Sequence, residues 1–120
     1  MYIRAILICS ILIATPMMAP VFAASPQSEG FKKLSGDQIR KALTGKQFSD
    51  GVHFSYRYAP DGTIQGTKMG KPVTDKWVVA NDKLCVTDRF GENCYTVWTK
   101  GAGVKLTVGE SDPFLEGILK

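Results

Sequence analysis

The strongest constraint on the fold is a pair of neighbouring hairpins whose strand registers can be predicted separately. If residues 81–82 form a two-residue turn, Val79 lies opposite Leu84. If Cys85 lies opposite Cys94, the following strand is aligned as well. Both registers place the same six apolar side chains on one face of the sheet: Trp77, Val79, Leu84, Val86, Tyr95 and Val97. A one-residue slip in either hairpin would divide this set between the two faces, so the agreement predicts an antiparallel meander.

Further short strands are predicted on both sides of these hairpins. Alternating apolar and polar residues indicate a strand over 52–58, and Pro60 with Gly62 marks the turn that follows it. The return strand, 63–69, is polar and contains Gly66, which predicts an edge strand or a bent strand. The remaining strands are expected near Phe48 and over 104–108 and 114–119.

One short helix is predicted before these strands. Ser35 is a favourable N-cap residue and Gln38 stands three positions later, as in a capping box. Ile39 and Leu43 contribute to an apolar stripe, and Gly45 favours a helix end. We therefore expect a mainly β domain, an antiparallel meander or small barrel of about eight short strands preceded by one short N-terminal helix.

The first 23 residues follow the order of a secretory signal peptide. Arg4 precedes an apolar run over 5–14, about half of the ~20 residues that a membrane-spanning helix needs. The small side chains of Val21 and Ala23 predict cleavage after Ala23. Removing 23 of the 120 residues leaves 97. This mature chain is expected to have no membrane span and to be periplasmic or secreted.

The mature chain is expected to contain one domain. A flexible leader over 24–30 is polar and aperiodic, and a single β-rich domain covers 31–120. Because Cys9 lies inside the signal peptide, Cys85 and Cys94 are the two cysteines left. An even number of cysteines in an exported chain predicts a disulfide bond between them.

The residue types present do not favour catalysis or metal binding. Two thiols and a single imidazole, that of His53, are too few for a zinc site. His53 can be combined with Asp50 and Ser55 as a nucleophilic triad, but no glycine-flanked nucleophile motif surrounds Ser55. Most carboxylates fall in predicted turns, where Asp bonds its own backbone. We therefore expect a protein that is not an enzyme and that uses no cofactor and no metal.

The charge distribution gives little indication of a partner. The chain has 15 Lys and Arg against 11 Asp and Glu, a formal net charge of +4, and the basic residues are scattered. Nucleic-acid binding needs a basic patch or stripe, so no nucleic-acid partner is expected.

Five aromatic side chains are candidates for binding a small ligand: Phe54, Tyr56, Tyr58, Trp77 and Tyr95. If the barrel is open at one end, they line an apolar cavity with a few hydroxyls, which is typical of small-ligand pockets. If the barrel is filled, they form its core. The leading hypothesis is a non-catalytic binding module for an unknown ligand.

The tip of the disulfide hairpin offers a second way of binding. Arg89 and Phe90 lie between the two cysteines, where turn residues are normally small and polar. A large exposed aromatic beside an arginine is typical of a contact anchor, whereas a Phe90 ring folded back over the disulfide would be structural. The alternative function is therefore an inhibitor or accessory subunit that docks on another envelope protein through this tip.

Several short motifs together resemble a known group of proteins. They are Ala42-Leu43-Thr44-Gly45-Lys46, Tyr58-Ala59-Pro60-Asp61-Gly62-Thr63 with Gly66, Asp75-Lys76-Trp77, Leu84-Cys85 and Cys94-Tyr95. This pattern, which covers most of the mature chain, resembles a group of short exported alphaproteobacterial proteins and domains of unknown function. The resemblance implies an antiparallel meander of lipocalin-like character and brings no catalytic residues with it.

Overall fold

The computed structural model of the protein describes residues 11, 13, 14, 16 and 25–120. The predicted signal peptide falls almost entirely outside these residues, and so does its cleavage site. The described elements follow one another as η1 (Pro26–Glu29, a 3-10 helix), β1 (Lys32–Lys33), α1 (Gly36–Leu43), β2 (Gln47–Ser49), β3 (Phe54–Tyr58), β4 (Thr63–Lys68), β5 (Lys71–Ala80), β6 (Lys83–Asp88), β7 (Gly91–Lys100), β8 (Gly103–Val108) and β9 (Asp112–Leu119).

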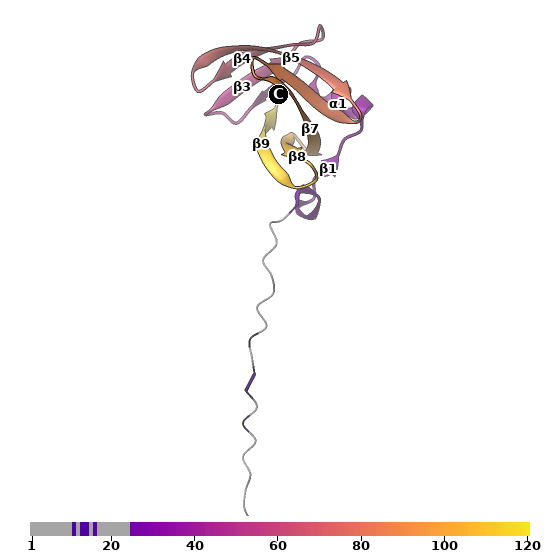
Figure 1. Cartoon of the computed structure of the whole chain (residues 1–120), viewed down its shortest axis with the longest axis vertical. Helices are drawn as coiled ribbons and strands as arrows, with labels where there is room; N and C mark the ends of the chain where they lie inside the picture. Colours follow the sequence, from indigo (N-terminus) through magenta and orange to yellow (C-terminus); the bar gives the residue numbers. More distant parts are fainter. Residues whose placement is uncertain (1–10, 12, 15, 17–24) are drawn as a thin grey trace, which may run out of the picture.

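Strands β2 to β9 form a closed antiparallel barrel. Each strand pairs with the next along the chain. In addition, β2 pairs with β9, which joins the two ends of the meander. Figure 1 shows β9, in yellow, curving beside β8. Strand β1 is an addition to the ring and pairs with β7. The prediction of a mainly β barrel of about eight strands with one short helix is confirmed.

The two predicted hairpin registers are both present. Val79 pairs with Leu84, and Cys85 pairs with Cys94. The turn at Asn81 has positive φ at both of its central residues, as a two-residue type I′ turn requires. The predicted face is the interior of the barrel, because four of its six side chains are buried and the other two, Trp77 and Val86, pack against the buried cluster.

Helix α1 closes one end of the barrel. Ser35 caps it in a capping box with Gln38, as predicted. Its buried side chains Ile39 and Leu43 belong to the same core as the barrel interior. The N–H of Gly36 donates to Asp82 Oδ1 at 2.7 Å, which ties the start of the helix to the β5–β6 turn.

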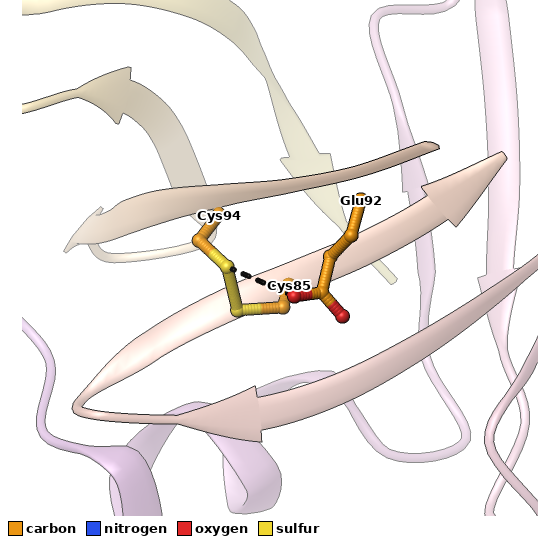
Figure 2. A group of neighbouring side chains, drawn as sticks. All are labelled: Cys85, Glu92 and Cys94. Carbon is orange, nitrogen blue, oxygen red and sulfur yellow. Dashed lines mark hydrogen bonds between the residues drawn. A yellow bond between two sulfur atoms is a disulfide. The ribbon is translucent and has the colours of Figure 1, made fainter. Parts of the chain in front are cut away.

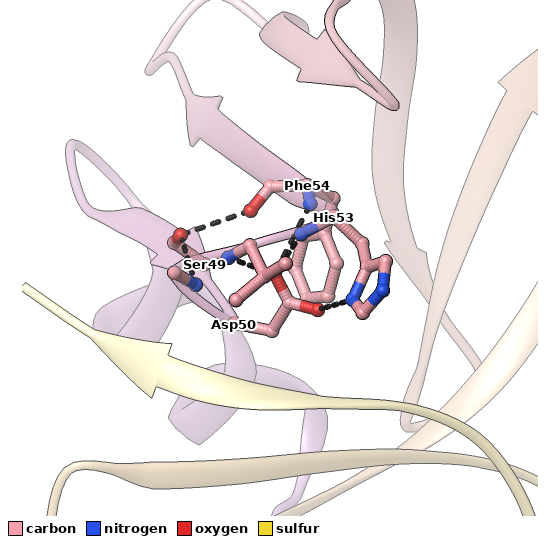
Figure 3. Close-up of polar contacts among 6 residues, drawn as sticks. Ser49, Asp50, His53 and Phe54 are labelled. Carbon is pink, nitrogen blue, oxygen red and sulfur yellow. Dashed lines mark hydrogen bonds and ion pairs between the residues drawn. The ribbon is translucent and has the colours of Figure 1, made fainter.

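Two strand predictions are corrected. The strand predicted over 52–58 begins only at Phe54, and Val52 is exposed, because the Asp50 carboxylate accepts backbone N–H bonds from residues 52–54 and holds them in a turn (Figure 3). Of the two alternatives predicted for β4, the edge strand is wrong, since β4 pairs with β3 and β5 in the closed ring. Gly66 permits this close pairing, because a Cβ at that position would lie 1.8 Å from the backbone oxygen of Ser55.

The segment around η1 and β1 covers part of the outer surface of β7 and β8. Trp98 is only 3% exposed although it faces away from the interior, and its Nε1 donates to Thr107 Oγ1 at 2.8 Å. The ammonium of Lys33 lies 5.8 Å from the Trp98 ring centre. Lys105 forms an ion pair with Glu29. The leader therefore packs on the barrel at these contacts, and this outer layer was not anticipated from the sequence.

Candidate functional site at the barrel mouth

The end of the barrel opposite α1 contains a cavity of about 490 Å³. We call this end the mouth. It is bordered by the β4–β5 and β6–β7 turns and by the start of β9. Tyr58, Ile64 and Leu106 lie furthest from these turns and form the floor, while residues beside the turns form the rim. The cavity lies inside the meander because α1 fills only the other end.

Three tyrosines line the cavity, all of them predicted from the sequence: Tyr56, Tyr58 and Tyr95. The Tyr58 side chain is 2% exposed, and burial raises its pKa well above the usual range, with smaller contributions from the other two tyrosines and Asp75. Among the described residues, no hydrogen bond satisfies the Tyr58 hydroxyl, yet that oxygen is not sealed off from the surface. A buried tyrosine hydroxyl normally has a partner, so this one is available to a group in the cavity.

Two aspartates also face the cavity. Asp75 lies between Val73 and Trp77 on the inward face of β5, where the strand alternates between partly buried and exposed residues. Asp88 ends β6 on the inward side, two positions from Val86. Burial raises the pKa of Asp75, as does the charge of Asp88, while Lys68 has the opposite, smaller effect.

The rim combines cations with apolar rings. Lys68, Lys71 and Arg89 are exposed and border the cavity. Phe114 stacks on Tyr95 with ring centres 4.4 Å apart, which extends the aromatic wall to the surface. Phe90 is 81% exposed and lies against the Arg89 guanidinium at 4.7 Å. This exposure favours the alternative in which the Phe90 ring is presented to solvent.

The structure brings together residues that the sequence had assigned to two separate functions. The ligand candidates Tyr56, Tyr58 and Tyr95 share the mouth with the docking candidates Arg89 and Phe90. The other two ligand candidates do not line this cavity. Phe54 packs against Phe48 with ring centres 5.0 Å apart, and Trp77 donates its Nε1 proton to the Ala59 carbonyl at 3.0 Å, near the opposite end.

Asp75 and Phe114 are mouth residues that sequence analysis missed. The signal for Asp75 was available, because the alternation that places Trp77 inward also places the residue two positions earlier inward. Phe114 could not be found in this way, since its stacking on Tyr95 depends on how β9 curves across the mouth.

The raised pKa of Asp75 predicts that its charge lowers the stability of the folded protein at neutral pH. A raised folded-state pKa contributes stability below the pKa of the unfolded chain, and this contribution is lost as pH rises through the folded-state pKa. Asp75→Asn should therefore raise Tm at pH 7 by ~2–4 °C, the shift that about 0.5 kcal/mol gives in a domain of this size. Thermal melts at about pH 3 should show no gain, because both states are then protonated.

Glu92→Gln is the matched control for this measurement, because Glu92 is an exposed carboxylate on the outward side of the β6–β7 hairpin. It should leave Tm unchanged at both pH values. An equal gain from Asp75→Asn at both pH values would mean that the effect does not come from the carboxylate charge.

The disulfide and Glu92 form a second cluster of ligand-type atoms. Cys85 and Cys94 are joined by an S–S bond, as predicted, and Figure 2 shows Glu92 beside them. The Glu92 carboxylate oxygen lies 3.9 Å from Cys94 Sγ, and a disulfide sulfur has no proton to donate, so this is a contact and not a hydrogen bond. Cysteine binds a metal as the thiolate, and these two cysteines are joined in a disulfide, so only the Glu92 carboxylate of this cluster is a metal ligand.

Asp50 and His53 form a close pair in the β2–β3 turn, with Oδ2 2.7 Å from His53 Nδ1 (Figure 3). The other Asp50 oxygen accepts three backbone N–H bonds, from residues 52, 53 and 54. Burial opposes ionisation of Asp50, but these hydrogen bonds together hold its pKa below the usual range. The Ser55 hydroxyl is bonded to Gln47 Nε2 instead of the imidazole. The arrangement of Asp50 is that of a turn-forming residue.

Comparisons with protein-family models, with curated proteins and with solved structures find no match to this chain. The resemblance to exported alphaproteobacterial proteins therefore stays a prediction. Among the described residues, no helix has the length and apolar character needed to cross a membrane.

Proposed function

We propose that the protein is an exported, non-catalytic binding module that holds a small molecule in the mouth of its barrel. The observation that carries this proposal is the cavity itself, at whose floor the Tyr58 side chain, only 2% exposed, carries a hydroxyl that has no hydrogen-bond partner among the described residues and is not sealed off from the surface. Such a hydroxyl is open to a ligand in the cavity, whereas sealing it in a filled core would cost free energy unless it were bonded.

The size and composition of the mouth support a ligand of modest size. Its volume of about 490 Å³ is within the ~300–1,000 Å³ that is common for small-molecule sites. Aliphatic and aromatic side chains form the walls, and the tyrosine hydroxyls, Asp75 and Asp88 add polar groups to the lining. This combination supplies affinity through burial and orientation through hydrogen bonds.

Docking on an envelope protein is the second proposed function, favoured by the exposure of Phe90. The ring lies in a hairpin whose strands are joined by the Cys85–Cys94 disulfide. Fixing the position of the ring on binding therefore costs little entropy. Because Phe90 also borders the cavity, a partner at this tip and a ligand in the mouth would influence each other.

Export to the periplasm or the outside of the cell is part of the same proposal. It is supported by the signal-peptide pattern of the first 23 residues and by the disulfide, since disulfides persist in oxidising compartments.

Filling the mouth from its wall tests the ligand-binding proposal. Val73→Trp should occupy part of the cavity, because Val73 lines it on β5. We expect the affinity for N-phenyl-1-naphthylamine, an uncharged fluorescent probe, to fall by at least about tenfold, which corresponds to ~1.4 kcal/mol of binding free energy. Fluorescence titration measures the affinity, and circular dichroism checks that the variant is folded.

Val78→Trp is the matched control, since Val78 lies on the same strand and is exposed on the outer side of the barrel. It should bind the probe as the parent does. If Val73→Trp binds the probe with parental affinity, or if both variants lose it equally, the probe does not occupy the mouth and the proposal is wrong.

A further inference from the structure

Two carboxylates border the mouth from adjacent strands, those of Asp75 and Asp88. They are the next residues beyond the Lys76–Thr87 pair, at which the β5–β6 ladder ends. Asp88 is exposed, and its Oδ1 accepts a hydrogen bond from the Phe90 N–H at 2.7 Å, which leaves Oδ2 for a ligand. Among the described residues, neither aspartate has a lysine or arginine within ion-pair distance. Two like charges on neighbouring strands repel one another, and a cation placed between them would relieve this repulsion.

The aromatic surfaces beside these carboxylates suit the same ligand. The rings of Tyr56, Tyr58 and Tyr95 line the cavity, and the faces of aromatic rings attract cations. The Tyr58 side chain is 2% exposed, and its hydroxyl, which has no partner among the described residues and is not sealed off from the surface, offers an oxygen at the floor that can accept a hydrogen bond. This acceptor is independent of the two carboxylates and points to a ligand with a hydrogen-bond donor.

The positively charged side chains of the rim do not determine the charge that a ligand meets inside the cavity. Lys68, Lys71 and Arg89 are exposed, and their long side chains can extend into water. Burial raises the pKa values of Tyr56 and Tyr95, and the charges of nearby aspartates raise them further. Burial also raises the pKa of Asp75, and the charge of Asp88 raises it by more than the charge of Lys68 lowers it. The negative charges of the site therefore lie close to the tyrosines, and its positive charges lie at the rim.

We propose that the mouth binds a small organic cation, a protonated amine with an apolar body, whose charge lies between Asp75 and Asp88 and against the tyrosine rings. The apolar body lies along the wall formed by Tyr95 and Phe114. This inference rests on the proposed ligand-binding function and adds the chemical class of the ligand. A desolvated cation beside aromatic faces and carboxylates gains from both, which a neutral molecule of the same shape does not.

Three probes that share one body and differ in charge test this inference: 4-phenylbutylamine, 4-phenylbutanol and 4-phenylbutyrate. Isothermal titration of the processed protein at pH 7 should show the amine binding at least about tenfold more tightly than the alcohol, and the butyrate more weakly than both. NMR shifts of the mouth residues, upon titration with the amine, should confirm that binding occurs there.

Matched variants assign the preference to the two carboxylates. Asp75→Asn and Asp88→Asn should each reduce the preference for the amine over the alcohol by about three- to tenfold, while the alcohol affinity stays within about twofold. Tyr58→Phe keeps the ring and removes the hydroxyl, so it should lower the affinity for the amine. The variant should still bind the amine more tightly than the butyrate. Glu92→Gln, on the outer side of the same hairpin, should change none of these values.

The outcomes separate this inference from the function on which it rests. If the alcohol or the butyrate binds in the mouth as tightly as the amine, the cation inference is wrong and the binding function stands. If the aspartate variants keep the full preference for the amine, the charge is recognised elsewhere and the inference is also wrong. If none of the probes binds at millimolar concentration, the proposed binding function is contradicted as well.

Discussion

Replacing Trp98 with alanine should lower the free energy of unfolding by ~3–5 kcal/mol, the usual cost of truncating a large buried aromatic. The side chain is 3% exposed, and it lies beneath the N-terminal segment that includes Lys33. The substitution would remove this packing and leave Thr107 without its indole partner. Small domains have a total stability of ~5–15 kcal/mol, so the variant would lose a large part of it.

Urea denaturation followed by circular dichroism measures this loss, and Trp98→Phe is its control. Phenylalanine keeps most of the ring and lacks the indole N–H, so we expect a smaller loss of ~1–2 kcal/mol. A Trp98→Ala protein within about 1 kcal/mol of the parent would mean that the N-terminal segment does not pack over this tryptophan in solution, because an exposed side chain costs little to remove.

Removing the disulfide with Cys85→Ala and Cys94→Ala together should lower the free energy of unfolding by ~2–4 kcal/mol. The two cysteines are nine positions apart and face each other across the β6–β7 ladder. The bond restricts the unfolded chain more than the folded one, because the ladder already holds the two strands together. The folded barrel should therefore form without the bond and be less stable.

A reductant provides the control for this prediction. Dithiothreitol should lower the stability of the parent toward that of the double variant and leave the variant unchanged, as measured by the same denaturation. If the parent carries two free thiols when it is isolated from the cell, or if the double variant is as stable as the parent, the disulfide does not contribute to this fold in its native compartment.

The local elements of this fold were predictable because short-range signals specify them. The turn at Asn81 selects a two-residue hairpin, and the alternation on either side of it decides which face is apolar. The capping box of α1 likewise lies within four residues, at Ser35 and Gln38. Each signal needs only the residues beside it, so the sequence alone was enough.

Closure and the composition of the site were decided only by tertiary structure. Ser49 and Ile118 pair although they are 69 positions apart, and no local sequence pattern indicates that the first and last strands of the meander pair with each other. Val52 lies in an exposed turn and not in a strand, because the Asp50 carboxylate binds the backbone there. Strand β4 is an inner strand because both β3 and β5 pair with it.

The sequence by itself determined the registers of two hairpins, the helix, the cysteine pair and the inward direction of the three mouth tyrosines. Tertiary structure decided that these tyrosines share a cavity with the Arg89–Phe90 tip, and that Trp98 is buried on the outside of the barrel. The physical reason is the range of the forces involved. Alternation and turn geometry fix the face on which a side chain lies, whereas its neighbours across the barrel depend on how many strands close the ring and on which segment covers its outer surface.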